Sequence, residues 1–346
     1  MTVNIARSSS LLGVLRAETG NPNLCYADPP RALTGGFWAE LLAFSLADPP
    51  SGWPGELVAR IMPEAAPARK ETVIQAAVAS AGFPTPLVRA SGSDCGSDCG
   101  LGRAFMVMDR ARGTHLVSGL TGPGAIVSAV AATRKVPGLL ATTMARVHSL
   151  DPAPVRDQLG SSCDVPLTVP ELLTRLRDMA REYRRADLTA AAQWLIDSPL
   201  APAPEVICHG DLHPFNVLVD GASICLLDWT AALLAPRTYD VAFTSLLLAE
   251  PPLDVPRALR PVVRQLGSRL ARGFVVRYEQ AAGIRVDPSE LRWHQGLGCL
   301  RALVESAGWA DQGLIEARAG HPWLVSGPAF AGRLAALTGS RVHAAG

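Results

Sequence analysis

Lysine is almost absent from this chain. Of the 32 basic residues among 346, only Lys70 and Lys135 are lysines. With the high content of alanine, glycine and proline, this composition is typical of a GC-rich genome. The 32 basic and 31 acidic residues leave a formal net charge of +1, whereas a dedicated nucleic-acid binder is usually clearly basic. The composition therefore argues against a DNA- or RNA-binding protein.

Long apolar runs are also missing. None reaches the roughly 18 residues of a membrane span, and the first twenty residues contain only the short run Leu11–Leu15, too short for a signal peptide. The seven cysteines are an odd number and form no C-x-x-C pair. Two of them, Cys208 and Cys225, lie inside apolar runs, as small buried side chains do. We expect a cytoplasmic protein with no membrane partner.

The most informative stretch is Val206–Trp229, VICHGDLHPFNVLVDGASICLLDW. Asp220–Gly221 is a strong turn signal between strands. The polar residues Asp211, Asn216 and Asp228 are therefore predicted at strand ends, in a rigidly held loop. The strands are expected at the three apolar runs Val206–Cys208, Val217–Val219 and Ile224–Leu227.

Asp211 and Asn216 have the spacing of the kinase catalytic loop H-R-D-x-x-x-x-N. Asp228 follows an apolar strand, as the kinase metal-binding aspartate does, and Trp229 stands where protein kinases have phenylalanine. Phosphoryl transfer needs a carboxylate to orient the acceptor hydroxyl, and Mg²⁺ prefers carboxylate and amide oxygens. We therefore expect Asp211 to be the catalytic residue and Asn216 and Asp228 to hold Mg²⁺.

The string HGDLHPFNVL followed by LLDW resembles the aminoglycoside phosphotransferase/choline kinase-like family of small-molecule kinases. The resemblance implies an α+β, two-lobed, protein-kinase-like fold. Residues 1–109 would form a nucleotide-binding lobe with a five-stranded antiparallel sheet plus a helix, and residues 110–346 a mostly helical catalytic and substrate-binding lobe. The implied reaction is transfer of the γ-phosphate of ATP or GTP to a hydroxyl of a small molecule, in some cases an antibiotic.

The resemblance also implies a nucleotide site in the N-terminal lobe. Gly35 and Gly36 lie in a predicted turn between two strands, where the family grips phosphates, although the family's small polar residue is replaced by phenylalanine. Arg60 falls where the family places its phosphate-contacting lysine or arginine, and Glu71 would hold it as the Lys–Glu pair does in kinases. Lys70 is the rival cation, and an ordinary surface ion pair is the alternative interpretation. The predicted hinge Asp109–Gly113 follows, and adenine is expected to bond backbone at Val107, Met108, Asp109 and Arg110.

Three further residues are expected to brace the catalytic loop, as in the family: His209, His213 and Asp240. His148, near the end of a predicted helix, is expected to be a core histidine. Further strands are predicted at Glu56–Met62, Pro84–Gly92 and Arg103–Met108. Helices are predicted at Ser8–Glu18, Glu71–Ala81, Pro137–Leu150, Glu171–Tyr183, Leu188–Ile196, Asp240–Ala249, Val255–Ala281, Pro288–Ala307 and Gly327–Leu337.

Two other interpretations use the same residues. His209, Asp211 and His213 form an H-x-D-x-H cluster that could bind Zn²⁺ or Fe in a metal-dependent hydrolase, but this leaves Asn216 and Asp228 without a task. A non-catalytic, kinase-like nucleotide-binding protein would explain the unusual Arg60 and glycine turn.

The acceptor is not a peptide. Eleven residues separate Asp228 from Asp240, too few for a protein kinase's activation segment, and no A-P-E follows. The segment from Ala242 to the C-terminus contains twelve arginines and eight acidic residues. A binding pocket for a polycationic aminoglycoside should instead have an excess of acidic residues. Trp293, Trp309 and Trp323 add large amphipathic surfaces. The composition favours a neutral or largely apolar acceptor of the macrolide kind, with an aminoglycoside or another amino alcohol as the alternative.

Overall fold

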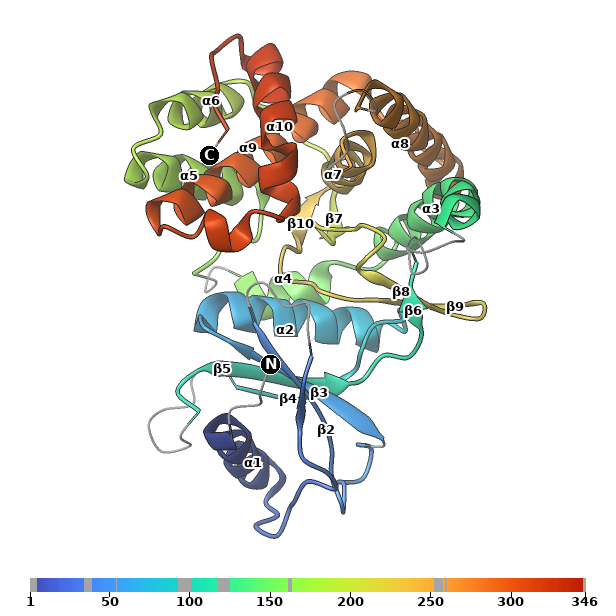
Figure 1. Cartoon of the computed structure of the whole chain (residues 1–346), viewed down its shortest axis with the longest axis vertical. Coiled ribbons are helices and arrows are strands. Elements are labelled where there is room, and N and C mark those ends of the chain that lie inside the picture. The colour runs from blue at the N-terminus through green and yellow to red at the C-terminus, as the bar shows by residue number, and fades with distance from the viewer. Residues whose placement is uncertain are drawn as a thin grey trace. The chain divides into compact units, whose positions relative to one another are not determined.

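The structure is a computed structural model that describes residues 5–33, 39–53, 55–92, 101–116, 125–160, 164–251, 258 and 260–344 (Figure 1). Its contacts divide the chain into two compact units. Unit 1 comprises Met1–His115, Ala153–Val165 and Asn216–Ala231, and unit 2 comprises Leu116–Pro152, Pro166–Phe215 and Ala232–Gly346. The division into lobes at residue 109 stays a prediction. Within the described part of the chain, no helix combines the length and apolarity that crossing a membrane requires.

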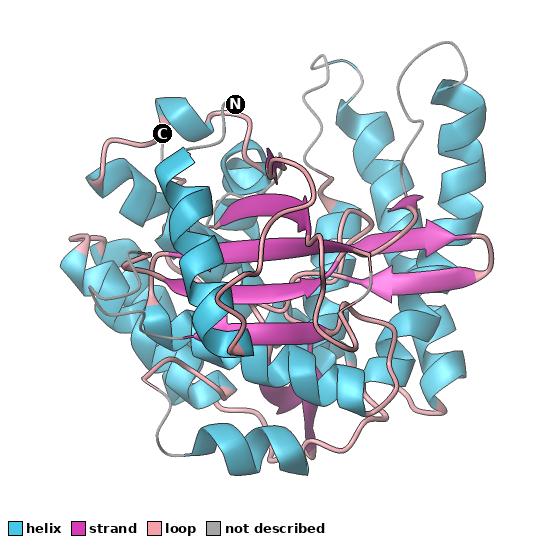
Figure 2. Cartoon of the chain, turned by 90° about the horizontal axis from the view of Figure 1, so that it is seen from below, coloured by secondary structure: helices cyan, strands magenta, loops and turns pink. Residues whose placement is uncertain are grey.

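Unit 1 contains the predicted five-stranded antiparallel sheet, and this prediction is confirmed (Figure 2). The strands lie in the order β1-β2-β3-β5-β4 and every neighbouring pair is antiparallel. Their bounds are β1 Arg31–Ala32, β2 Glu40–Ser45, β3 Glu56–Met62, β4 Val88–Gly92 and β5 Ala104–Asp109.

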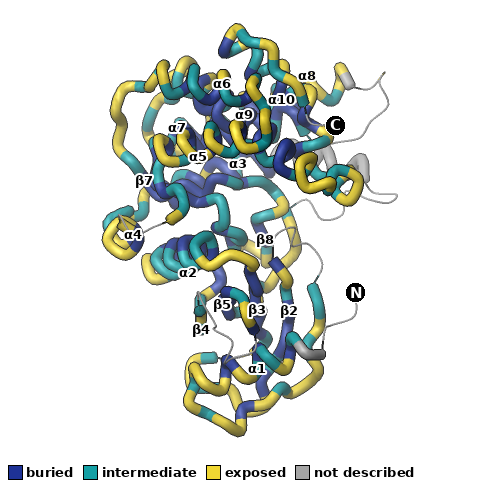
Figure 3. Tube along the Cα trace, turned by 90° about the vertical axis from the view of Figure 1, so that its left-hand side faces the viewer, coloured by how far each residue is buried: buried dark blue, intermediate teal, exposed yellow. Residues whose placement is uncertain are grey.

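Helices cover both faces of this sheet. Alternate residues of a strand point to opposite faces, so Leu57, Ala59 and Ile61 of β3 join one buried cluster with α1 (Ile5–Thr19). Met62 joins a second cluster with Ala68 of α2 (Ala65–Ser80). Both faces of the central strands are therefore buried (Figure 3). Arg60 has the parity of Met62, so it points to the α2 side.

A smaller sheet in the order β6-β8-β9 completes unit 1. Its strands are β6 (Thr114–His115), β8 (Val217–Asp220) and β9 (Ser223–Leu226). The predicted Asp-Gly turn joins β8 to β9, with Gly221 at φ 59°, a backbone region in which glycine is favoured. Helix α4 (Ala153–Leu159) packs against α2.

Unit 2 is mostly helical around one antiparallel strand pair, β7 (Glu205–Cys208) with β10 (Leu233–Pro236). Helices α5, α6, α9 and α10 bury one large apolar core with these strands, and α3 packs along α8 (Figure 1). The side chain of Asp287 caps the start of α9 by accepting from the amides of Ser289 and Glu290. The bounds are α3 Ala125–Val147, α5 Val169–Glu182, α6 Ala186–Asp197, α7 Arg237–Ala249, α8 Arg260–Ala282, α9 Pro288–Asp311 and α10 Pro322–Thr338, with a short 3₁₀ turn at Glu316–Arg318.

Several predicted helix starts are wrong because the place of a proline in the helix was misjudged. Helix α2 begins at Ala65 and not at Glu71, because Pro67 lies in the first turn, where the amide it lacks has no helical partner. Helix α3 runs through Pro137, which was predicted to start it. Helix α10 begins at Pro322, a favoured first position, instead of Gly327. Helix α4 and strands β6 and β10 were not predicted.

Candidate functional site

In unit 2, the segment after β7 makes a tight turn that presents Asp211. Gly210 adopts φ 73°, where a side chain would be strained. The amides of His209 and Gly210 both donate to the carboxylate of Asp240, each at 2.7 Å. The ring Nδ1 of His209 accepts from the amide of Asp211 at 3.2 Å. The backbone on the N-terminal side of Asp211 is therefore fixed by three hydrogen bonds.

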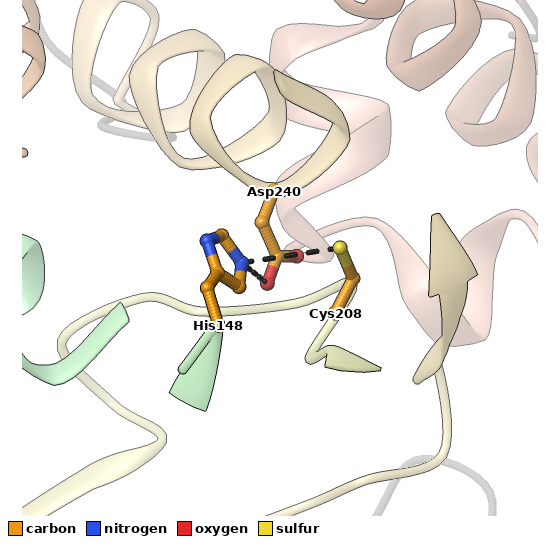
Figure 4. Close-up of side chains that lie close together, drawn as sticks. All are labelled: His148, Cys208 and Asp240. Carbon is orange, nitrogen blue, oxygen red and sulfur yellow. Dashed lines mark hydrogen bonds and ion pairs between the residues drawn. The ribbon is translucent and has the colours of Figure 1, made fainter. Parts of the chain in front are cut away.

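The carboxylate of Asp240 is itself held by a buried network (Figure 4). His148 Nε2 lies 3.2 Å from Asp240 Oδ2, and His148 Nδ1 lies 2.7 Å from the Tyr278 hydroxyl. Burial would raise the pKa of Asp240, but His148, His209 and the Gly210 amide more than offset it, so the pKa is lowered. An ionised, well-bonded carboxylate therefore anchors the turn.

Cys208 completes a group of three potential metal ligands with His148 and Asp240 (Figure 4). Their ligand atoms are already engaged in hydrogen bonds, since the Cys208 thiol donates to the Ala235 carbonyl at 3.6 Å. Burial raises the pKa of this thiol well above its usual range, which disfavours the thiolate that a metal needs. The group is better explained as a brace than as a metal centre.

The structure does not support the interpretation of His209, Asp211 and His213 as a metal site. Among the described residues, the metal-ligand group that comes together is the one around Asp240, not His209, Asp211 and His213. His213 Nε2 does lie 3.5 Å from Asp211 Oδ2, while its Nδ1 accepts from the Phe215 amide.

In unit 1, Asn216 and Asp228 lie close to each other at the open end of the β8–β9 hairpin. Val217 pairs with Leu226, and the next cross-strand bond runs from the Leu227 amide to the Asn216 carbonyl at 2.8 Å. Asp228 follows directly, at φ 64°, a left-handed conformation that non-glycine residues adopt rarely and often at functional sites.

Trp229 clamps this hairpin end. Its side chain is fully buried, and the indole Nε1 donates to Thr85 Oγ1 at 2.9 Å, while Thr85 donates to the Leu226 carbonyl at 2.8 Å. A phenylalanine could not donate this hydrogen bond. The tryptophan therefore fixes the strand that delivers Asp228.

Arg60 connects three groups of unit 1 around Asp228. Its Nε lies 3.3 Å from Glu71 Oε1, so the expected ion pair is present. Its Nη2 lies 3.2 Å from Asp228 Oδ1 and donates to Thr230 Oγ1 at 2.7 Å. Thr230 also donates to Asp228 Oδ1 at 2.6 Å.

Burial sets the protonation of this cluster. Glu71 is completely buried, and burial raises its pKa to about 7 although Arg60 acts in the opposite direction. Burial would lower the pKa of Arg60, but Glu71 and Asp228 more than offset it, and the pKa is raised. Lys70, the rival cation, is buried within α2, and its effect in lowering the pKa of Glu71 is smaller than that of Arg60.

The predicted adenine contacts at Val107–Arg110 lie in and just after β5. Val107 and Met108 pair with both neighbouring strands. The amides of Asp109 and Arg110 donate to the Leu87 and Glu56 carbonyls, at 3.0 and 2.9 Å. These two amides are therefore used by the sheet, and an adenine would have to meet other backbone groups of the Asp109–Gly113 hinge. Gly35 and Gly36 lie outside the described residues.

An aromatic and cationic group lies where α9 ends and α10 begins. Trp309 and Trp323 stack with ring centroids 5.9 Å apart and planes 15° apart. Arg318 lies over the Trp309 ring, and His321 packs against both tryptophans. Burial and Arg318 lower the pKa of His321 to about 4, and Asp211 partly offsets this, so the catalytic candidate and this aromatic group share one electrostatic neighbourhood.

Sequence reasoning missed Thr85, Thr230, Tyr278 and Arg301. Thr230, two residues after Asp228, could have been found, because Ser and Thr hydroxyls often bond a nearby aspartate. The others contact the site across 91 to 144 residues of chain, and no spacing rule reveals such pairs.

The profile of the phosphotransferase enzyme family, APH, matches residues 46–294 of the chain. Among curated proteins, none matches closely enough to count as a relative. Many solved structures share the fold. A protein from Ralstonia eutropha, named as a putative aminoglycoside phosphotransferase, is 17% identical with a TM-score of 0.61, over 94% of this chain and 95% of its own. Macrolide 2'-phosphotransferase type I is 18% identical with a TM-score of 0.57, over 100% of both chains. A ternary complex of aminoglycoside phosphotransferase APH(4)-Ia with ADP and hygromycin B is 19% identical with a TM-score of 0.54, over 95% of this chain and 98% of that one.

The family profile covers well over half of the chain. The chain is an enzyme and belongs to the phosphotransferase enzyme family.

Proposed function

We propose that this enzyme transfers the γ-phosphate of ATP or GTP, with Mg²⁺, to a hydroxyl of a largely apolar small molecule. The observation that carries the proposal is the cluster of Arg60, Glu71 and Thr230 around Asp228. It combines a cation for nucleotide phosphates with a carboxylate held in a strained conformation.

The chemistry of the donor groups fits Mg²⁺. Asn216 and Asp228 supply the hard amide and carboxylate oxygens that this ion prefers, and the Asp228 side chain is 38% exposed, so it can be reached from solvent. When bound, Mg²⁺ would neutralise charge on the phosphates.

Asp211 is proposed to orient the acceptor hydroxyl and to accept its proton. Its side chain is 29% exposed, and the backbone before it is fixed through Asp240. Such positioning is the main contribution a protein makes to phosphoryl transfer. Arg60 is proposed to contact the nucleotide phosphates, with Glu71 holding its guanidinium in place.

The α9–α10 region supports a largely apolar acceptor. Trp309 is partly exposed and stacks on the buried Trp323, and Arg318 and His321 contact these rings. Glu305, a third exposed, pairs with Arg301. The cations beside Trp309 offer little charge complementarity to a polycationic acceptor, whereas an apolar acceptor could pack against the exposed part of Trp309. Similar structures act on both classes, as their names state.

A screen of hydroxylated compounds with Mg·ATP, reading ADP release, tests the acceptor class. We expect turnover with macrolides and none above background with kanamycin-like aminoglycosides. Turnover with aminoglycosides alone would overturn the acceptor class and would favour the amino-alcohol alternative. ADP release with no acceptor, and no increase with any, would favour a nucleotide-binding protein without a transfer role.

The metal assignment has its own test. An Asp228→Ala protein should bind Mg·ATP at least about tenfold more weakly than wild type, because a charged ligand to the ion is lost. Asp178→Ala is the control, since Asp178 is an exposed aspartate of α5 in unit 2. Equal Mg·ATP affinity of Asp228→Ala and wild type would contradict the assignment.

A further inference from the structure

Arg301 is a buried cation of α9 whose contacts converge on the turn that presents Asp211. Its side chain is only 13% exposed. Its Nη1 donates to the carbonyl of Gly210 at 2.9 Å, and its Nε donates to Glu305 Oε1 at 3.2 Å. Arg301 is also close enough to Tyr239 to lower the pKa of that phenol, although burial has the larger effect and raises this pKa to about 12.

The Gly210 residue is thereby held from two sides. Its amide donates to Asp240 Oδ1 and its carbonyl accepts from Arg301. Because both peptide groups flanking its Cα are bonded, rotation of the backbone just before Asp211 is restricted on both sides. Asp240 comes from α7 and Arg301 from α9, so two helices fix one residue.

The same guanidinium contacts the aromatic group. It lies over the ring of Trp323, 5.3 Å from the centroid, and over the ring of Phe243 at 5.5 Å. Cations over aromatic faces are attracted by the ring quadrupole, more strongly when water is excluded. Arg301 is therefore the residue that joins the rings of α7 and α10 to the Gly210 carbonyl.

Electrostatics keep this arginine charged. Burial would lower its pKa, but Tyr239, Glu305 and Asp211 more than offset burial, and the pKa is raised.

We propose that Arg301 is a positioning residue that ties the Gly210–Asp211 turn to the buried rings of Trp323 and Phe243. The functional part of this inference rests on the proposed role of Asp211. Both rings belong to the buried interior of unit 2, so they hold the guanidinium in a fixed place, and Arg301 holds the Gly210 carbonyl in the geometry that aims Asp211. Glu305 keeps the guanidinium plane oriented for both contacts.

The test compares full-length Arg301→Met and Arg301→Lys proteins with an Arg185→Met control. Arg185 is a close match: its side chain is 20% exposed, it pairs with Asp187, and it donates to a backbone carbonyl, that of His343. Deuterium exchange of the backbone over residues 206–215 reports the turn directly. Turnover is measured with Mg·ATP and a macrolide, and as Mg·ATP hydrolysis alone.

We expect exchange over 206–215 to accelerate about tenfold in Arg301→Met, because the turn opens more readily, and to stay at the wild-type rate in Arg185→Met. The kcat for the acceptor should fall about 100-fold, with the KM for Mg·ATP within about threefold of wild type. Arg301→Lys keeps the charge but lacks the planar guanidinium that bonds Gly210 and Glu305 at once, so it should give an intermediate result. If Arg301→Met does not fold, Arg301→Lys takes its place in the comparison with Arg185→Met.

Unchanged exchange over 206–215 in a folded Arg301 variant would overturn the proposal. So would a kcat loss no larger than that of Arg185→Met. Failure of wild type to phosphorylate any acceptor would count against the proposed function, and the exchange comparison would still decide whether Arg301 holds the turn.

Discussion

The two units hold their key carboxylates in different ways. In unit 2, both oxygens of Asp240 accept short backbone hydrogen bonds, and His148 adds a third contact. In unit 1, Arg60 Nε and Glu71 Oε1 are buried and face each other at 3.3 Å without hydrogen-bond geometry. A buried charge without aligned partners costs free energy.

This difference fits two roles. A network with aligned partners rigidifies a loop, which suits the turn before Asp211. A cluster whose charges are imperfectly matched can reorganise when a polyanionic ligand arrives. We infer that the turn of unit 2 is preorganised, whereas the cluster of unit 1 would reorganise when the proposed nucleotide binds.

The largest effect is expected from Asp211→Asn. The amide keeps the size of the side chain but cannot accept a proton, so turnover should fall by about three orders of magnitude. Mg·ATP affinity, measured by calorimetry, should stay within about threefold, because Arg60 and Asp228 are intact. Near-normal turnover in this variant would remove Asp211 from its proposed role.

Asp240→Asn should break the braced turn of unit 2. The amide oxygen can accept from one of the two amides, and its NH₂ group faces the other donor, so unfolding free energy should drop by about 2–4 kcal/mol. Turnover should fall about 100-fold as the turn loosens. Chemical denaturation and steady-state kinetics measure the two effects.

Asp187→Asn is the matched control for Asp240→Asn. Asp187 also accepts a backbone amide, from His343, and pairs with an arginine, and its pKa is also lowered. It lies away from the turn, at the start of α6. Equal loss of turnover in the two variants would show that stability, and not the turn, controls activity.

Part of the site in each unit could be predicted from the sequence. The resemblance to small-molecule kinases led to the Arg60–Glu71 pair of unit 1 and to His209 and Asp240 as braces of the turn in unit 2. The Asp220–Gly221 turn likewise fixed the hairpin that delivers Asp228. Arg301 and Tyr278 carried no such signal, since Arg301 meets Gly210 across 91 residues and Tyr278 meets His148 across 130.

Glu71→Gln should change how stability depends on pH. The pKa of Glu71 is raised to about 7 in the fold from an ordinary value of 4.5. A raised carboxyl pKa stabilises the fold fully below about pH 4.5, and this contribution is lost as pH rises through about 7. Wild type should therefore lose up to about 3 kcal/mol relative to Glu71→Gln between pH 5 and 8. Apparent melting midpoints of both proteins over this range measure it, and parallel pH curves would show that Glu71 does not titrate there.

Thr230→Val should have the smallest effect, and it asks whether the cluster of unit 1 is as loosely organised as its ion pair indicates. The hydroxyl accepts from Arg60 and lies within hydrogen-bond distance of the carboxylates of Asp228 and Glu71, and its loss removes these bonds without changing shape or charge. If the cluster reorganises around a nucleotide, the KM for Mg·ATP should rise only about two- to fivefold. Hydrogen bonds with charged groups contribute about 1.5–3 kcal/mol when they are rigidly held, and less when other bonds replace them on binding. Thr238→Val, which removes a hydroxyl that donates to Glu290 in unit 2, should leave this KM unchanged. A loss near 100-fold for Thr230→Val would mean that unit 1 is as preorganised as unit 2, and the contrast between the two units would fail.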